Sequence, residues 1–141
     1  MNDKIESVAI EPVSEQQKPL EGLYAEALLK ELATWTNTTT IILHGGCVFE
    51  FKGRFPKGAI GHGFYNLGGD APGFQGHIRL EAVKHIEFQD RPHRGRESYA
   101  FNFMDSENQS IFKVFLGRDQ QGQLLQKQVS VFKCIRSQLH L

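Results

Sequence analysis

The sequence predicts an α+β domain in which antiparallel β-sheets are flanked by an N-terminal and a C-terminal helix. Two observations predict this fold class. Apolar residues recur at helical spacing only towards the two ends of the chain, whereas the long middle part carries short runs that alternate or are rich in β-branched residues. Helices and strands also do not alternate along the chain, which argues against a parallel sheet built from β–α–β units.

The first predicted helix covers residues 20–35. Its apolar stripe recurs at steps of three and four residues and consists of Leu20, Leu23, Tyr24, Ala27, Leu28, Leu32 and Trp35. Residues 1–19 are polar and contain two prolines, so we expect a flexible N-terminal lead there. Residues 20–141 are predicted to form a single domain, since a chain of 141 residues can bury a core of its own.

Strand-like runs follow this helix. They cover residues 38–44, 48–52, 63–67, 76–80, 85–89, 98–104 and 110–116, with a turn at Gly45-Gly46. Eight of the fourteen glycines lie between residues 53 and 76, a density typical of turns, bulges and close backbone approach to a flat group. A C-terminal helix is predicted from about residue 123, with an apolar stripe of Leu125, Val129, Phe132, Ile135 and Leu139.

The composition argues against several classes of protein. Sixteen basic and sixteen acidic residues balance, so no global field favours nucleic acid or an anionic membrane. No apolar run behind Met1 resembles a signal peptide, and none elsewhere is long enough to span a bilayer. Cys47 and Cys134 form no C-x-x-C pattern, so neither a disulfide framework nor a zinc site is expected. We therefore expect a cytoplasmic protein.

Motifs of common enzyme classes do not stand out. Gly61-His62-Gly63 begins like a dinucleotide-binding loop, but residue 66 is asparagine and no helix is predicted to follow. The sequence contains neither H-E-x-x-H nor G-x-S-x-G. A hydrolase therefore has no support in the sequence.

The histidines are more informative, because five of the six lie between residues 44 and 93. Neutral imidazole is a natural ligand of haem iron, and aromatic side chains suit the faces of the macrocycle. Strand alternation places His44 on one face with Thr40 and Ile42, and His77 on one face with Arg79. An imidazole for iron beside a guanidinium for a propionate would suit haem. The alternative is that each is an ordinary surface or hydrogen-bonding histidine, which is the commoner case.

Other candidates have ordinary explanations. His85 shares its face with acidic and amide side chains and is expected on a solvated side. The basic run at residues 91–96 is expected to be a solvated loop, with a propionate or partner contact as the alternative. Cys47 and Met104 could ligate iron, but buried thiols and thioethers usually serve packing. His140 lies near the end of the chain and is given no role.

Three short motifs follow one another in order: GHGFYNL at residues 61–67, GHI at residues 76–78 and IFKVFLGRD at residues 111–119. Together they resemble the ChuX/HutX family of cytosolic haem-utilisation proteins, and the likeness extends from about residue 20 to the C-terminus. The resemblance implies a two-sheet α+β fold similar to half of a larger HemS-type haem protein. It also implies a homodimer that binds haem taken up by the cell.

The resemblance also implies roles for particular residues. His77 matches the histidine most associated with iron coordination in some members, and His44 matches a second histidine that modulates it. In other members a tyrosine at the position of Phe64 serves haem binding. Phe64 has no oxygen, and strand alternation turns Tyr65 to the opposite face, so no tyrosinate ligand is expected. The expected haem-binding residues are therefore His77, His44, Phe64 and Arg79, with the two histidines as iron ligands.

Three functions remain open at this point. The leading hypothesis is a cytosolic carrier that buffers imported haem b and passes it to a haem-degrading enzyme, with one weakly held axial ligand that can exchange. The second is that the protein itself degrades haem, in which case bound haem would turn over when a reductant is supplied. The third is a structural or regulatory homodimer with vestigial haem binding, suggested by the missing tyrosine at residue 64.

Overall fold

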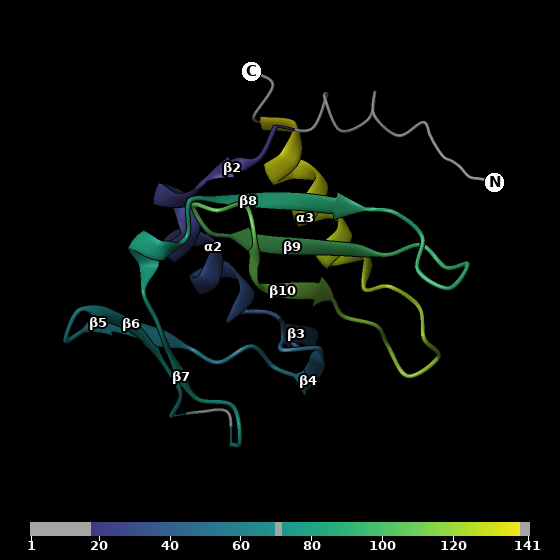
Figure 1. Cartoon of the computed structure of the whole chain (residues 1–141). Helices are drawn as coiled ribbons and strands as arrows, with labels where there is room; N and C mark the ends of the chain where they lie inside the picture. The colour runs from purple at the N-terminus through teal and green to yellow at the C-terminus, as the bar shows by residue number, and fades with distance from the viewer. Residues whose placement is uncertain (1–17, 70–71, 139–141) are drawn as a thin grey trace.

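A computed structural model describes residues 18–69 and 72–138, and these residues form two antiparallel sheets and two α-helices (Figure 1). The predicted α+β class is confirmed. Most of the predicted flexible lead, residues 1–17, lies outside the described residues, as do Leu139 and His140. Within the described residues, no helix has the length and apolar character needed to cross a membrane.

The larger sheet has six strands in the order β2-β8-β9-β10-β3-β4, and every neighbouring pair is antiparallel. Its strands are β2 (Leu20–Glu21), β3 (Thr38–His44), β4 (Cys47–Gly53), β8 (His85–Asp90), β9 (Tyr99–Met104) and β10 (Ser110–Leu116). The predicted bounds of β3 and β10 are reproduced, because long β-branched and alternating runs mark a strand from end to end.

Both helices, α2 (Ala25–Leu32) and α3 (Gln126–Gln138), pack on one face of this sheet (Figure 1). The Phe132 ring of α3 lies 5.5 Å from the ring of Phe88 and 5.0 Å from that of Phe101, between ring centroids. Trp35, just after α2, reaches the same Phe101 at 6.3 Å. The centre of the core is thus an aromatic cluster between the sheet and the two helices.

The first predicted helix is wrong at its beginning. Residues 20–21 form β2, residues 22–24 form the 3₁₀ turn η1 (Gly22–Tyr24), and α2 starts only at Ala25. The reason is a tertiary contact: the Gly22 amide donates to the Lys84 carbonyl at 2.9 Å, and a Cβ at Gly22 would lie 2.0 Å from the Val83 carbonyl oxygen. Leu23, predicted on the buried stripe, is therefore 74% exposed.

The smaller sheet consists of β5 (Gly58–Gly61), β6 (Phe64–Leu67) and β7 (Gly76–Ile78), antiparallel and in that order. It lies to the left of β3 and β4 in the view of Figure 1. β5 was not predicted, and β7 is shorter than the predicted strand at residues 76–80, since residues 80–82 form the 3₁₀ turn η2 (Leu80–Ala82). The β5–β6 turn is tight, with positive φ angles of 54° at His62 and 82° at Gly63.

Buried aromatic residues fasten the smaller sheet to the core. Tyr65 of β6 is fully buried, and Phe55 just before β5 is 1% exposed. The Phe74 ring stacks on Phe51 of β4 at 4.7 Å and meets Phe55 edge-on at 5.6 Å. Gly58 has to be glycine for this packing, because a Cβ there would lie 2.4 Å from Cε2 of Tyr65. One face of the small sheet is therefore fixed, and the other is turned outwards.

Candidate functional site

Four side chains gather on the outward face of the small sheet: Phe64 and Asn66 of β6, His77 of β7, and Arg79 directly after it. In β6, Phe64 and Asn66 alternate with Tyr65 and Leu67, which are buried. Asn66 and His77 are register partners across β6 and β7, so they lie opposite each other. His77 and Arg79 are exposed, and Phe64 is half-buried. The cluster is therefore open to a ligand from outside.

The His77 imidazole is held by the amide of Asn66. His77 Nδ1 lies 2.6 Å from Asn66 Oδ1, and Asn66 Nδ2 donates to the carbonyl oxygens of Gly61 at 3.0 Å and Ala59 at 3.3 Å. Carbonyls only accept hydrogen bonds, so the amide nitrogen faces them and its oxygen faces His77. In the neutral imidazole Nδ1 then donates, and Nε2 keeps the lone pair that can bind a metal.

An aromatic ring and a cation complete the cluster. The centroid of the Phe64 ring lies 5.7 Å from that of His77, and Arg79 Cζ lies 4.7 Å from the centroid of the same ring. The second contact is a cation–π interaction that holds the guanidinium over the ring. Three of the four predicted site residues, Phe64, His77 and Arg79, thus lie together, although β7 ends before Arg79.

An apolar cavity of about 430 Å³ adjoins the cluster. It lies between the two sheets, and its lining includes His77 and Arg79 together with Thr40, Ile42, Phe55, Leu67, Phe74, Ile78, Ile111 and Phe112. Its size falls in the range of small-molecule and cofactor sites. Thr40 is 2% exposed, and its Oγ1 has no hydrogen-bond partner among the described residues. Hollows of similar or larger size occur elsewhere, for example about 500 Å³ between α2 and α3, but no histidine lines that one.

His44, the second predicted iron ligand, is not part of this cluster. It ends β3, is exposed, and has Cys47 as its register partner across the turn. Thr40 and Ile42 on its face line the cavity, but His44 does not. Within the described residues no hydrogen bond or ring contact joins His44 to His77. Of the histidines that the structure describes, the cluster therefore contains His77 alone.

Tyr65 is turned away from the cluster, as strand alternation predicts. It is fully buried, and this burial raises the pKa of its hydroxyl. Cys47, predicted to be a packing residue, is exposed, because β4 is the edge strand and its side chains there find no cover in the described residues. Met104 is buried, in keeping with packing.

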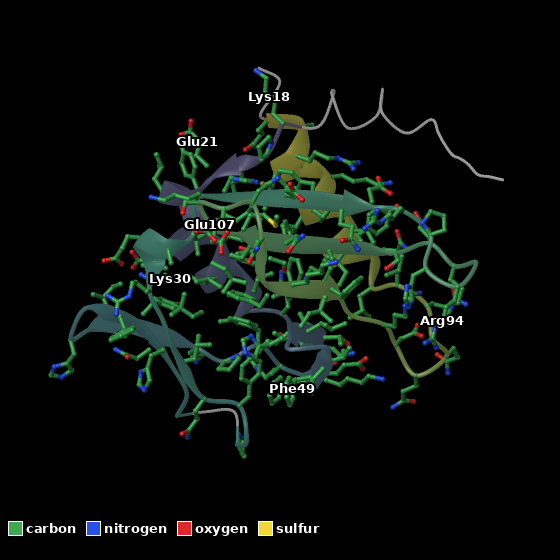
Figure 2. The ribbon with its side chains drawn as sticks, viewed as in Figure 1. Lys18, Glu21, Lys30, Phe49, Arg94 and Glu107 are labelled. Atoms are coloured by element: carbon green, nitrogen blue, oxygen red, sulfur yellow. The ribbon has the colours of Figure 1, made fainter. Side chains whose placement is uncertain are left out.

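The basic run at residues 91–96 lies elsewhere. His93 and Arg96 pair across a turn whose tip is Arg94, with a positive φ of 55°, and Arg96 donates to the Gly122 carbonyl. Figure 2 shows Arg94 at the end of the molecule away from the small sheet. The run is therefore a structured turn, and contact with a propionate bound at His77 has no support in this arrangement.

Comparison with known proteins gives the family. The family described as Haem utilisation ChuX/HutX matches residues 18–135. The chain belongs to this family. A protein of Vibrio cholerae serotype O1 named intracellular heme transport protein HutX is 38% identical over 119 residues, which are 84% of this chain and 62% of that protein. This ChuX/HutX chain thus spans about three-fifths of the length of that relative.

Solved structures agree with this membership. The crystal structure of ChuX matches with a TM-score of 0.79 and 32% identity, over 88% of this chain and 77% of that one. A protein from Erwinia carotovora matches with a TM-score of 0.81 and 34% identity, over 89% and 78% of the two chains. Apo-PhuS from Pseudomonas aeruginosa shares the fold alone, with a TM-score of 0.71 at 12% identity over 85% of this chain and 35% of that longer one. The predicted likeness to part of a HemS-type protein is confirmed.

Asn66 and the cavity were not among the predicted site features. Asn66 becomes visible as a partner of His77 only when β6 and β7 are paired in register. A signal was nevertheless present, because asparagine is disfavoured in strands, and its position between the apolar Tyr65 and Leu67 called for a reason. The cavity depends on how the two sheets meet, which no local pattern encodes.

Proposed function

We propose that this protein binds haem b at the His77 cluster and carries it inside the cell. The observation that carries the proposal is the His77 imidazole, exposed and oriented by Asn66 at 2.6 Å, beside an aromatic ring, a guanidinium and an apolar cavity. These features match the needs of bound haem: a nitrogen ligand for the iron, apolar contacts for the macrocycle and cations for the propionates. The ChuX relative bears the name heme binding protein, and the Vibrio relative the name intracellular heme transport protein.

Each residue of the cluster has a task in this proposal. His77 Nε2 binds the iron, the Phe64 ring packs on the macrocycle, and the Arg79 guanidinium pairs with a propionate. The cavity between the sheets takes the apolar substituents of the porphyrin, because most of its lining residues are aliphatic or aromatic. The haem is the cargo, and the chain serves to hold it apart from water and from other haem.

A single protein ligand suits a carrier. His44 lies apart from His77 in this chain, so one side of the iron remains available for exchange. Release then requires that only one coordinate bond be replaced by a ligand of the acceptor. We propose a haem-degrading enzyme as that acceptor, because such an enzyme consumes the cargo.

The proposal includes a homodimer. Strand β4 is an edge of the larger sheet, and around its turn Leu43, Val48 and Phe49 are 50%, 57% and 52% exposed. Figure 2 shows Phe49 at the lower rim of that sheet. An uncovered sheet edge with large apolar side chains is a common site of self-association. A second copy that covers this edge would shield it and would also place new side chains near the small sheet.

A haem titration followed by absorption spectroscopy tests the proposal. The wild type is expected to bind one haem per chain saturably, and His77→Ala to weaken binding by more than about tenfold, or 1.4 kcal/mol, with an altered Soret band. His85→Ala is the matched control, since His85 lies in β8 and contacts Glu87 at 3.5 Å. His44→Ala measures the second predicted ligand and should have a smaller effect than His77→Ala.

The same samples separate the alternatives. Sedimentation velocity reports whether the chain is dimeric. Addition of a reductant leaves the porphyrin intact if the protein is a carrier, whereas loss of the Soret band with product formation would make it a haem-degrading enzyme. Absence of saturable binding by the wild type would overturn the proposal and leave a structural or regulatory protein as the best remaining reading.

A further inference from the structure

We propose that Asn66 is a positioning residue that fixes the tautomer of His77 and sets the strength of the bond from His77 to iron. The proposal rests on the proposed function, because it takes His77 as the iron ligand. Asn66 itself does not contact the iron. It acts through the 2.6 Å hydrogen bond between its Oδ1 and His77 Nδ1.

Asn66 is anchored independently of His77. Its amide nitrogen faces the carbonyl oxygens of Gly61, Ala59 and Phe64 at 3.0, 3.3 and 3.4 Å, all in the β5–β6 hairpin. Rotation of the amide by a half-turn would set Oδ1 against these carbonyl oxygens, four acceptors without a hydrogen between them. The orientation of the amide is therefore determined by the hairpin, and the oxygen is presented to His77 whether or not a ligand is bound.

The fixed oxygen decides which ring nitrogen of His77 carries the proton. Nδ1 must donate to Oδ1, so the neutral ring presents Nε2 with its lone pair to the outside. In an unrestrained histidine side chain the opposite tautomer, with the proton on Nε2, is the more stable. Without Asn66 the ring would first have to move this proton before Nε2 could bind iron.

The chemical nature of the acceptor then tunes the bond to iron. A hydrogen bond from the non-ligating ring nitrogen raises the basicity of the ligating one, and a carboxylate does so more strongly than a neutral oxygen. Asn66 supplies a neutral amide oxygen, which orients the ring but adds less electron density than an aspartate would. This intermediate strength suits a protein that must both hold its haem and give it up.

The first test uses the protein without haem. Long-range ¹H–¹⁵N NMR of the imidazoles, at a pH where His77 is neutral, should show the proton on Nδ1 of His77 in the wild type. In Asn66→Leu, which keeps the branched shape of the side chain and removes the acceptor, the proton should move mainly to Nε2. A wild-type His77 with its proton on Nε2 would overturn the inference, whatever the protein does with haem.

The second test uses the haem complexes of Asn66→Asp and Asn66→Leu. Both variants lose the amide donor to the hairpin carbonyls, so damage to the hairpin would change the reduction potential of both complexes in the same direction. We instead expect the potentials of the two variants to shift in opposite directions. Asn66→Asp should lower the reduction potential and raise the iron–histidine stretching frequency of the ferrous form, and Asn66→Leu should do the reverse. Asn66→Leu should also bind ferric haem about 10- to 100-fold more weakly.

These outcomes separate the two proposals. If His77→Ala changes haem binding but the two Asn66 variants shift together or not at all, the inference is overturned and the proposed function stands. If His77→Ala changes neither the spectrum nor the affinity of the haem complex, His77 is not the iron ligand. The proposed role of Asn66 is then overturned as well. Thermal melts of the apo-proteins show that each variant is folded before its haem complex is measured.

Discussion

The two sheets of this protein differ in what covers them. The larger sheet carries both helices on one face, and the Phe132 ring of α3 lies within 5.5 Å of the rings of Phe88, Tyr99 and Phe101. The smaller sheet has three short strands, and its outward face bears the His77 cluster with no helix of the described residues over it. The fold thus separates the part that provides stability from the part that carries the proposed binding site.

This separation still requires a firm attachment. The inner face of the small sheet is held by Tyr65 and Phe55, both almost completely buried, and by the stack of Phe74 on Phe51. An exposed ligand on an anchored strand keeps its geometry, whereas the same ligand on a loose loop would lose orientation and affinity. Stability and haem binding should therefore respond differently to mutations in the two sheets.

The largest expected effect comes from the core of the larger sheet. Phe132→Ala should lower the free energy of unfolding by about 3–5 kcal/mol, because it leaves a cavity within the aromatic cluster. Urea unfolding followed by circular dichroism measures this loss, with the exposed neighbour Lys133→Ala as control. Under conditions where the variant is still folded, its haem affinity should stay within about threefold of the wild type (about 0.6 kcal/mol). A larger loss of affinity in the folded variant would contradict the separation of the two sheets.

Gly58→Ala tests the anchor of the small sheet. The new methyl group would lie 2.4 Å from Cε2 of Tyr65, so either the ring or β5 must shift. We expect a loss of about 1–3 kcal/mol in the free energy of unfolding, as for other overpacked sites. The displaced strand should also weaken haem binding more, relative to its stability loss, than Phe132→Ala does.

Gly76→Ala is the matched stability control for this substitution. Gly76 lies in the same sheet, but a Cβ there meets no atom within 4 Å. Its stability should therefore stay near that of the wild type in the same urea titration. If Gly58→Ala is equally harmless, Tyr65 is not the anchor of the small sheet.

Local patterns of the sequence predicted the larger sheet better than the smaller one. The bounds of β3 and β10 follow from uninterrupted runs, whereas β5 has the sequence Gly58-Ala59-Ile60-Gly61, which is too short and too rich in glycine to signal a strand. The first predicted helix begins late, at Ala25, because the Gly22 backbone contacts Val83 and Lys84, which are distant in the sequence. Such contacts are set by the tertiary packing.

The candidate site shows the same limit. Alternation along the strand correctly turned Tyr65 away from the face of Phe64. Parity also grouped His44 with Thr40 and Ile42, but only the latter two line the cavity, since His44 lies at the end of β3 beyond it. Alternation predicts the face of a residue but not its distance from a site on another sheet. The role of His44 stays a prediction.

The smallest expected effect concerns the hydroxyl of Tyr65. This buried group has no hydrogen-bond partner among the described residues, so Tyr65→Phe should raise the free energy of unfolding by about 1 kcal/mol at neutral pH. Burial also raises the pKa of Tyr65 above its ordinary value of 10.0, an effect that the nearby Lys30 partly opposes. Urea unfolding of the wild type and the variant at several pH values measures both quantities.

The sign of the pH effect follows from the protons bound by each state. Above pH 10 the unfolded chain loses the tyrosine proton while the folded chain keeps it, so the wild type loses stability as the pH rises towards the raised pKa of Tyr65. Tyr65→Phe removes this loss of stability. The difference in the free energy of unfolding between the variant and the wild type should therefore grow above pH 10. The haem affinity of the variant should not change, because the hydroxyl lies on the face opposite His77. A weaker haem complex would mean that the Tyr65 hydroxyl, which does not line the cavity, nevertheless affects the binding site.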